Sequence, residues 1–172
     1  MEVIEAVKTR RSIRSFQDRE ISDKETARLI EALIWAPSAG NLQSRKFYFV
    51  TDSKTKDSLC RAALNQTFIA KAPLVIVGCA DLRIVNRYGL RGVELYCIQD
   101  VACSIMCMML AAHEVGLGTA WVGAFHEDQA ADALGLPDHL RPVVIAPVGW
   151  PEEIPSAPKR FGPEEAVVWV RE

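Results

Sequence analysis

The stretch Leu95–Val115, LYCIQDVACSIMCMMLAAHEV, is the longest helix-favouring run in this chain of 172 residues. Gly116 follows it and is expected to end the helix at a C-terminal cap. From Ile98 to Ala112 apolar side chains occur on nearly every side, and such a helix must be covered all round. The pattern therefore predicts a core helix whose spare apolar face meets a partner subunit. The apolar part is too short and too interrupted for a membrane span.

The rest of the chain alternates between strands and helices, which predicts one domain over residues 1–172 with helices on both faces of a sheet. The continuous apolar run LVIVGCA at 74–80 is typical of a central buried strand. Further strands are expected at Phe47–Thr51, Thr119–Val122, Val143–Val148 and Val167–Arg171. Helices are expected at Glu2–Lys8, at 22–36 behind a Ser22/Glu25 capping box, from a Ser53 cap to Ala63, and at Glu127–Leu134 before Gly135. The polar segment Leu82–Glu94 is expected to be a loop.

The composition gives no support to several classes of protein. A net charge of −2 gives no support to nucleic-acid binding. The N-terminus lacks the apolar region of a signal peptide, so a soluble protein is expected. The five cysteines match no zinc spacing, so no metal site is expected, and a reduced, cytoplasmic setting is predicted. Cys103 and Cys107 are interpreted as small core hydrophobes.

Two basic stretches are candidates for holding a phosphate group. The phosphate-binding loop and the dinucleotide fingerprint are both missing: Gly116 and Gly118 begin a GxG, but Trp121 stands at the third glycine position. Arg10-Arg11-Ser12-Ile13-Arg14 offers planar charged donors and a hydroxyl, and Lys159-Arg160 adds two cations after a proline-rich loop. Taken singly, each of these stretches also fits ordinary solvated surface charge.

Two further stretches combine polar groups with small residues. Ala36–Gln43, APSAGNLQ, packs amides and a hydroxyl into a tight loop, and such groups suit the edge of a heterocycle. In Gly116–Phe125, GLGTAWVGAF, Gly123 allows close approach to backbone N–H groups. Ordinary turn chemistry and a helix cap followed by a strand are the alternatives at these two places.

Taken in order along the chain, RRSIRSF, APSAGNLQ, GLGTAWVGAF and PKRFGPEE resemble the nitroreductase family. The segment RYGLRGVELYCIQD also looks like one that many members carry before the long helix. The resemblance implies an α+β fold with a mixed sheet, an antiparallel core and flanking helices. It also implies a homodimer with FMN bound at the interface by residues of both subunits.

The resemblance assigns cofactor-binding roles by position. Arg10, Arg11, Ser12 and Arg14 would contact the phosphate, the ribityl chain and the pyrimidine edge, with Arg14 nearest N1 and O2. The other subunit would supply Pro37, Ser38, Ala39 and Asn41, with Gln43 and Asn65 as further polar contacts. Gly123 and Ala124 would offer backbone donors near N5 and O4, while Lys159 and Arg160 close on the phosphate.

The implied reaction passes hydride from NADH or NADPH through FMN to a small acceptor such as a nitroaromatic or a quinone, with ping-pong kinetics. FMN carries the chemistry, so no catalytic side chain is assigned, and His113 and His126 are interpreted as a helix residue and a turn residue. Two alternatives stay open: a specialised flavin enzyme of reductive dehalogenase or flavin-fragmenting type, and a non-enzymatic flavin-binding protein. Many members continue the Asn-x-Gln stretch with Pro-Trp, where this chain has Ser44-Arg45.

Overall fold

The apolar run at 74–80 forms β2 (Leu74–Asp81), the buried strand around which a computed structural model arranges residues 1–171. β2 pairs on one side with β1 (Arg45–Val50) and on the other with β4 (Leu140–Gly149), both antiparallel. The short strand β3 (Gly118–Thr119) adds to β4 and completes the order β1-β2-β4-β3. The expected α+β class and antiparallel core are confirmed, and Ser12 adds a parallel bridge to Thr119.

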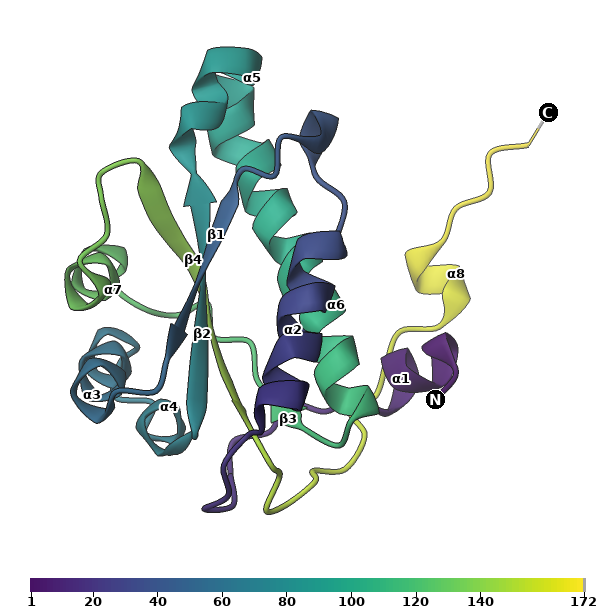
Figure 1. Cartoon of the computed structure of the whole chain (residues 1–172). Helices are drawn as coiled ribbons and strands as arrows, with labels where there is room; N and C mark the ends of the chain where they lie inside the picture. The colour runs from purple at the N-terminus through teal and green to yellow at the C-terminus, as the bar shows by residue number, and fades with distance from the viewer. Residues whose placement is uncertain (172) are drawn as a thin grey trace.

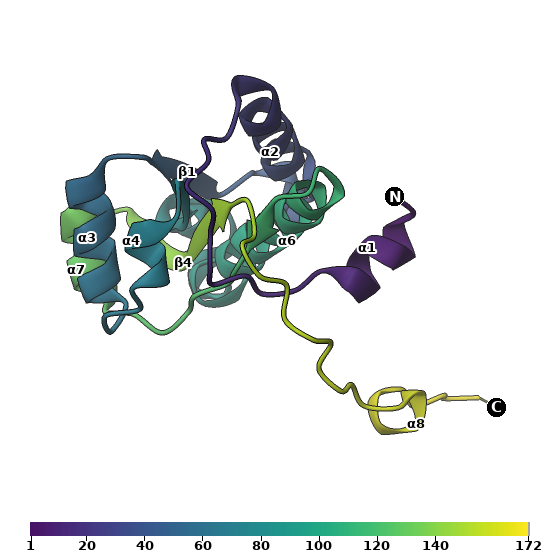
Figure 2. The ribbon, with the colours of Figure 1, turned by 90° about the horizontal axis from the view of Figure 1, so that it is seen from below.

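Helices cover both faces of this sheet, as the sequence predicted (Figure 1). One face carries α3 (Ser53–Ala62), α4 (Phe68–Lys71) and α7 (Glu127–Leu134). The other face carries α2 (Asp23–Trp35) and α6 (Cys97–Glu114). The two end helices, α1 (Val3–Thr9) and α8 (Pro163–Ala166), lie to the side of this body, and the C-terminal segment extends away from it (Figure 2).

The predicted core helix α6 packs directly against the sheet. Val101, Ile105 and Met108 are fully buried in one apolar cluster with residues of β2, β4 and α2. Close approach requires glycine at position 78, because a Cβ there would lie 2.7 Å from Val101. By length and composition alone, the helical run Leu82–Glu114 would suffice to cross a membrane, but core helices pass the same test, and 44% of its apolar window is buried inside the fold.

Most local signals in the sequence have the predicted outcome. Ser22 and Glu25 form a reciprocal capping box at the start of α2, which ends before Pro37. Gly135 and Gly116 adopt the left-handed conformation after α7 and α6. The cap of α3 differs from the expectation, because the side chain of Asp52, and not of Ser53, accepts the amide of Thr55.

Three expectations are wrong in the single chain. Residues 82–94 are helical, as η2 (Leu82–Ile84), α5 (Val85–Arg91) and a π-helical turn (Gly92–Tyr96), because Gly89 absorbs a kink at φ 57°. Val167–Arg171 forms no strand, since no neighbouring strand of its own chain offers hydrogen bonds. Cys103 is exposed and Cys107 half-buried, because they lie on the side of α6 that faces away from the sheet.

We expect Gly78→Ala to lower the free energy of unfolding by about 1–3 kcal/mol, because the added methyl overpacks the contact between β2 and α6. Urea denaturation measures this change. Lys54→Ala, on the exposed surface of α3, is the control and should alter stability little. A Gly78→Ala protein as stable as the parent would show that β2 and α6 are not this closely packed.

Candidate functional site

Basic side chains gather where the N-terminal segment passes the end of α6. Arg10 is half-buried, and its Nη1 is buried without a hydrogen-bond partner among residues 1–171. Burial lowers the pKa of Arg10, and the nearby charges of Arg160 and Arg11 lower it further. An arginine stays protonated despite such a shift, so this cluster holds unneutralised positive charge. An anion is the partner that such a cluster lacks.

A small cavity of about 110 Å³ lies beside this cluster, lined by Thr9, Arg10, Arg11 and residues of the α6–β3 turn. Its volume is several times the roughly 10–15 Å³ that one water molecule needs. His113, in the last turn of α6, also lines the cavity, and its Nε2 lies 2.8 Å from the Thr9 hydroxyl. The C-terminal end of a helix favours positive charge, so α6 helps to hold these cations together.

The structure places Ser12 beside Thr119 of β3 and Arg14 over the ring of Phe68. The Ile13 amide donates to the Thr119 carbonyl at 2.9 Å, which ties the N-terminal segment to β3. Gln66, next to the predicted Asn65, donates to the Ala124 carbonyl at 3.3 Å. Arg14 lies over the ring of Phe68, 5.9 Å from its centroid. The structure thus brings Arg160 and Arg11 close to Arg10 and joins Ser12 to β3, while Arg14 lies at Phe68 and Lys159 and Arg160 are exposed. That Asn65, Gly123 and Ala124 belong to the same site stays a prediction.

The loop with Pro37, Ser38, Ala39, Asn41 and Gln43 lies at the other end of α6. The Ala39 amide donates to Oδ1 of Asp100, in the first turn of that helix, at 2.8 Å. The loop is tightly wound, with left-handed φ angles of 54° at Gly40, 56° at Asn41 and 52° at Gln43. Its polar groups therefore form a second cluster, apart from the arginines.

Helix α6 sets the distance between these two clusters. Asp100 contacts the loop and His113 contacts Thr9, thirteen positions apart, which corresponds to about 20 Å at 1.5 Å per residue. One chain therefore holds two separate half-sites, at opposite ends of one helix. That the loop serves a cofactor bound mainly by the other subunit stays a prediction.

Sequence reasoning missed three polar residues at these half-sites. His113 was assigned only a helical role, yet it lines the cationic cavity. Asp100 is 4% exposed and anchors the loop, and the only hint in the sequence was a carboxylate within an otherwise apolar helix. Arg45 was noted only as a departure from the Pro-Trp that many family members have, yet it donates to carbonyls of the same loop.

The comparisons with known proteins point to one family. The model of the nitroreductase family matches residues 7–79 and 60–150. An NADPH-flavin oxidoreductase of Vibrio harveyi is 31% identical over 173 residues, covering 96% of this chain and 72% of that protein. An FMN reductase [NAD(P)H] of Bacillus subtilis is 30% identical over 183 residues, with coverage of 96% and 72%.

Solved structures agree with this result. The NADPH:FMN oxidoreductase of Vibrio harveyi, complexed with NAD+, superposes with a TM-score of 0.90 at 26% identity, covering 99% of this chain and 77% of that one. The chain therefore has the fold of a nitroreductase-type enzyme. It belongs to the nitroreductase family, as its four ordered motifs indicated.

We expect the stability of the apoprotein to rise with pH below about 6.5, in part because of His113. Burial lowers the pKa of His113 from 6.5, and the charges of Arg10 and Arg11 lower it further. Between this lowered value and 6.5 the unfolded chain binds the extra proton, so stability falls as the pH drops through that window. Urea unfolding from pH 5 to 7.5 should show a shallower slope in His113→Gln, with His139→Gln as the control. Equal slopes in the parent and His113→Gln would contradict this role.

Proposed function

We propose that this chain is an FMN-dependent oxidoreductase that takes hydride from NADH or NADPH and passes it to a small acceptor such as a nitroaromatic or a quinone. The observation that carries the proposal is the cationic cluster around the buried, unpartnered Nη1 of Arg10. It fits a phosphate group. Relatives named as FMN reductases align with 95% and 96% of this chain, at 29% and 30% identity. FMN, when bound, accepts a hydride and releases the electrons to an acceptor.

Arg10, Arg11 and Ser12 would hold the phosphate of FMN, and Lys159 and Arg160 would close over it. Arg14 lies on the same segment, over the ring of Phe68. Its charge would stabilise the negative charge that reduction places on the N1–O2 edge of a bound flavin. Gly123 and Ala124 are exposed and offer backbone N–H groups near N5 and O4. No side chain is needed as a general acid or base.

The working unit is a homodimer in the cytoplasm, and each flavin lies between one subunit's arginines and the partner's loop. The half-sites lie about 20 Å apart along α6, so one chain cannot close both around a single isoalloxazine. Large apolar side chains are also exposed: Trp35 at 80%, Phe161 at 80% and Trp169 at 74%. Exposed apolar surface of this extent is typical of an interface, and the C-terminal segment is part of it.

We expect Arg10→Gln and Arg14→Gln to affect the bound flavin differently. Arg10→Gln should weaken FMN affinity about ten- to a hundred-fold, because a charge-assisted hydrogen bond to phosphate is lost. Arg14→Gln should chiefly lower the midpoint potential, by about 30 mV for each 1.4 kcal/mol of differential binding. Anaerobic potentiometry and flavin titration measure both quantities.

The same titrations test the proposal as a whole. FAD should bind less tightly than FMN to the parent protein. If neither flavin binds after reconstitution, the proposed function is wrong. Bound flavin that neither NADH nor NADPH can reduce would instead favour a non-enzymatic flavin protein. An unchanged potential in Arg14→Gln, with a lowered one in Arg10→Gln, would reverse the two assigned roles.

We expect a stable dimer at nanomolar concentration in sedimentation, because interfaces of this kind bury roughly 2,000–5,000 Å². Met106→Lys places a charge on the outer side of α6 and should yield monomers that have lost FMN. Asp57→Lys, exposed on α3 at the opposite face of the sheet, is the control and should stay dimeric. A folded, FMN-bound monomer of the parent protein would contradict the proposal.

A further inference from the structure

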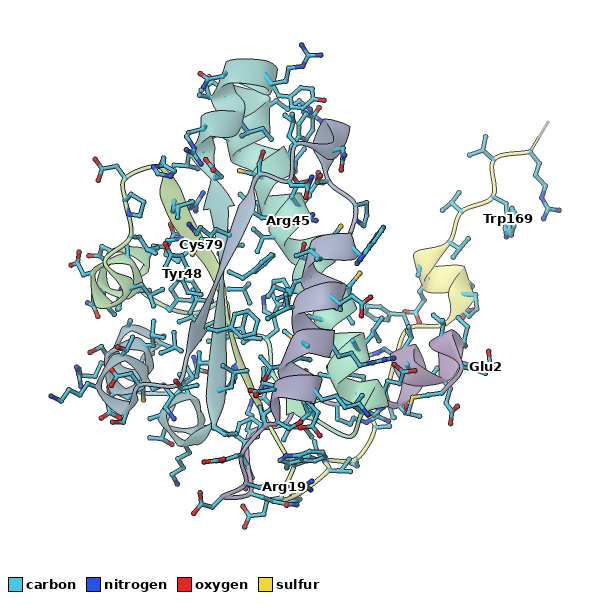
Figure 3. The ribbon with its side chains drawn as sticks, viewed as in Figure 1. Glu2, Arg19, Arg45, Tyr48, Cys79 and Trp169 are labelled. Carbon is cyan, nitrogen blue, oxygen red and sulfur yellow. The ribbon has the colours of Figure 1, made fainter. Side chains whose placement is uncertain are left out.

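Arg45, the first residue of β1, binds backbone carbonyls where many family members have tryptophan. Its Nη2 donates to the Ala36 carbonyl at 2.6 Å and to the Ile34 carbonyl at 3.2 Å, and its Nη1 donates to the Pro37 carbonyl at 2.7 Å. Carbonyls at the end of a helix lack helical partners and carry partial negative charge. Figure 3 shows Arg45 between β1 and α2, next to the start of the loop.

Asp100 holds the same loop from the other side. Its Oδ1 accepts the Ala39 amide, while its Oδ2 is buried without a partner among residues 1–171. Arg45 is the cation close to this carboxylate: burial lowers the pKa of Arg45, and the charge of Asp100 opposes that shift. Each charge therefore compensates the burial of the other, and both are bonded to the loop backbone.

The loop between these contacts has a conformation that residues other than glycine adopt at a cost. Asn41 and Gln43 have φ angles of 56° and 52°. The backbone N–H of Gln43 donates to the Ser38 hydroxyl at 3.0 Å. Gly40 lies against Tyr88, whose hydroxyl would be 2.3 Å from an added Cβ. Such backbone persists only where the surrounding contacts determine it, and it is frequent at sites that clamp a ligand.

We propose that Arg45 is a positioning residue, which together with Asp100 holds the 36–43 loop in the conformation that contacts the partner subunit's flavin. The inference rests on the proposed function, because the loop's contact with flavin is part of it. It also gives the Ser44-Arg45 departure a role, since a guanidinium can donate to three carbonyls at once. The alternative is a plain helix cap, which stabilises α2 and leaves flavin binding unchanged.

The test compares Arg45→Met, Arg45→Lys and Asp100→Asn in the full-length protein, at a temperature where all are folded. Arg61→Met is the matched control, because Arg61 lies on α3 and donates to the Ser58 hydroxyl. FMN affinity should fall about tenfold in Arg45→Met, the equivalent of one charge-assisted hydrogen bond. Arg45→Lys should recover part of this loss, and Arg61→Met should show none. Asp100→Asn keeps an acceptor for the Ala39 amide and removes only the charge. Because Arg45 and Asp100 hold the same loop, the double variant should lose less FMN affinity than the sum of the two single losses.

Hydrogen exchange in the apoprotein provides a readout without flavin. The amides of Ala39 and Gln43 should exchange faster in Arg45→Met, while amides in the middle of α2 keep their protection. If the parent binds no FMN, the proposed function fails, but the exchange result still decides whether Arg45 holds the loop. A lower unfolding temperature with unchanged FMN affinity and unchanged exchange would overturn the proposal in favour of a plain cap. If Arg45→Met does not fold, unchanged affinity in both Arg45→Lys and Asp100→Asn overturns it.

Discussion

The packing of α6 against the sheet is the constraint on which the rest of this structure depends. The helix is buried on its inner side and tied at both ends, through Asp100 to the polar loop and through His113 to the N-terminal segment. A rigid helix fixes the distance between the two clusters at about 20 Å and prevents them from closing on each other. A cofactor that needs both clusters must therefore be completed by a second copy of the chain.

The charges at the two ends of α6 follow the helix dipole. A carboxylate lies in the first turn, and arginines with a histidine gather around the last turn, which is the favourable sign at each end. Each end also holds a buried group without a hydrogen-bond partner within residues 1–171, Oδ2 of Asp100 and Nη1 of Arg10. Such groups are costly to leave unsatisfied, so natural proteins retain them mainly where a ligand or a neighbouring charge compensates. The guanidinium of Arg45 lies close to Asp100, and under the proposed function the phosphate of FMN would compensate Arg10.

Local features of the fold could be predicted from the sequence because neighbours along the chain determine them. The Ser22 capping box, the Gly135 cap and the buried strand β2 each depend on a few adjacent residues. The predicted strand at Val167–Arg171 was wrong because a strand needs a hydrogen-bonded neighbouring strand, and none within residues 1–171 pairs with this segment. The helix at 85–91 was missed because Gly89 and Gly92 resemble loop residues, yet their backbone fits a kinked helix. Four polar motifs were identified in order, but only the fold shows that α6 divides them into two groups.

The polar loop illustrates why a motif alone could not define this half-site. In the sequence, APSAGNLQ is an ordinary turn, and nothing in it specifies left-handed backbone at Asn41 and Gln43. Residues outside the loop hold this conformation. Arg45, two positions after the loop, donates to its backbone, and Asp100, far along the chain, accepts from it. Tryptophan at position 45 would offer a single N–H donor, whereas arginine reaches three carbonyls and also balances Asp100. A change of residue type at this position therefore requires a different way of holding the same loop.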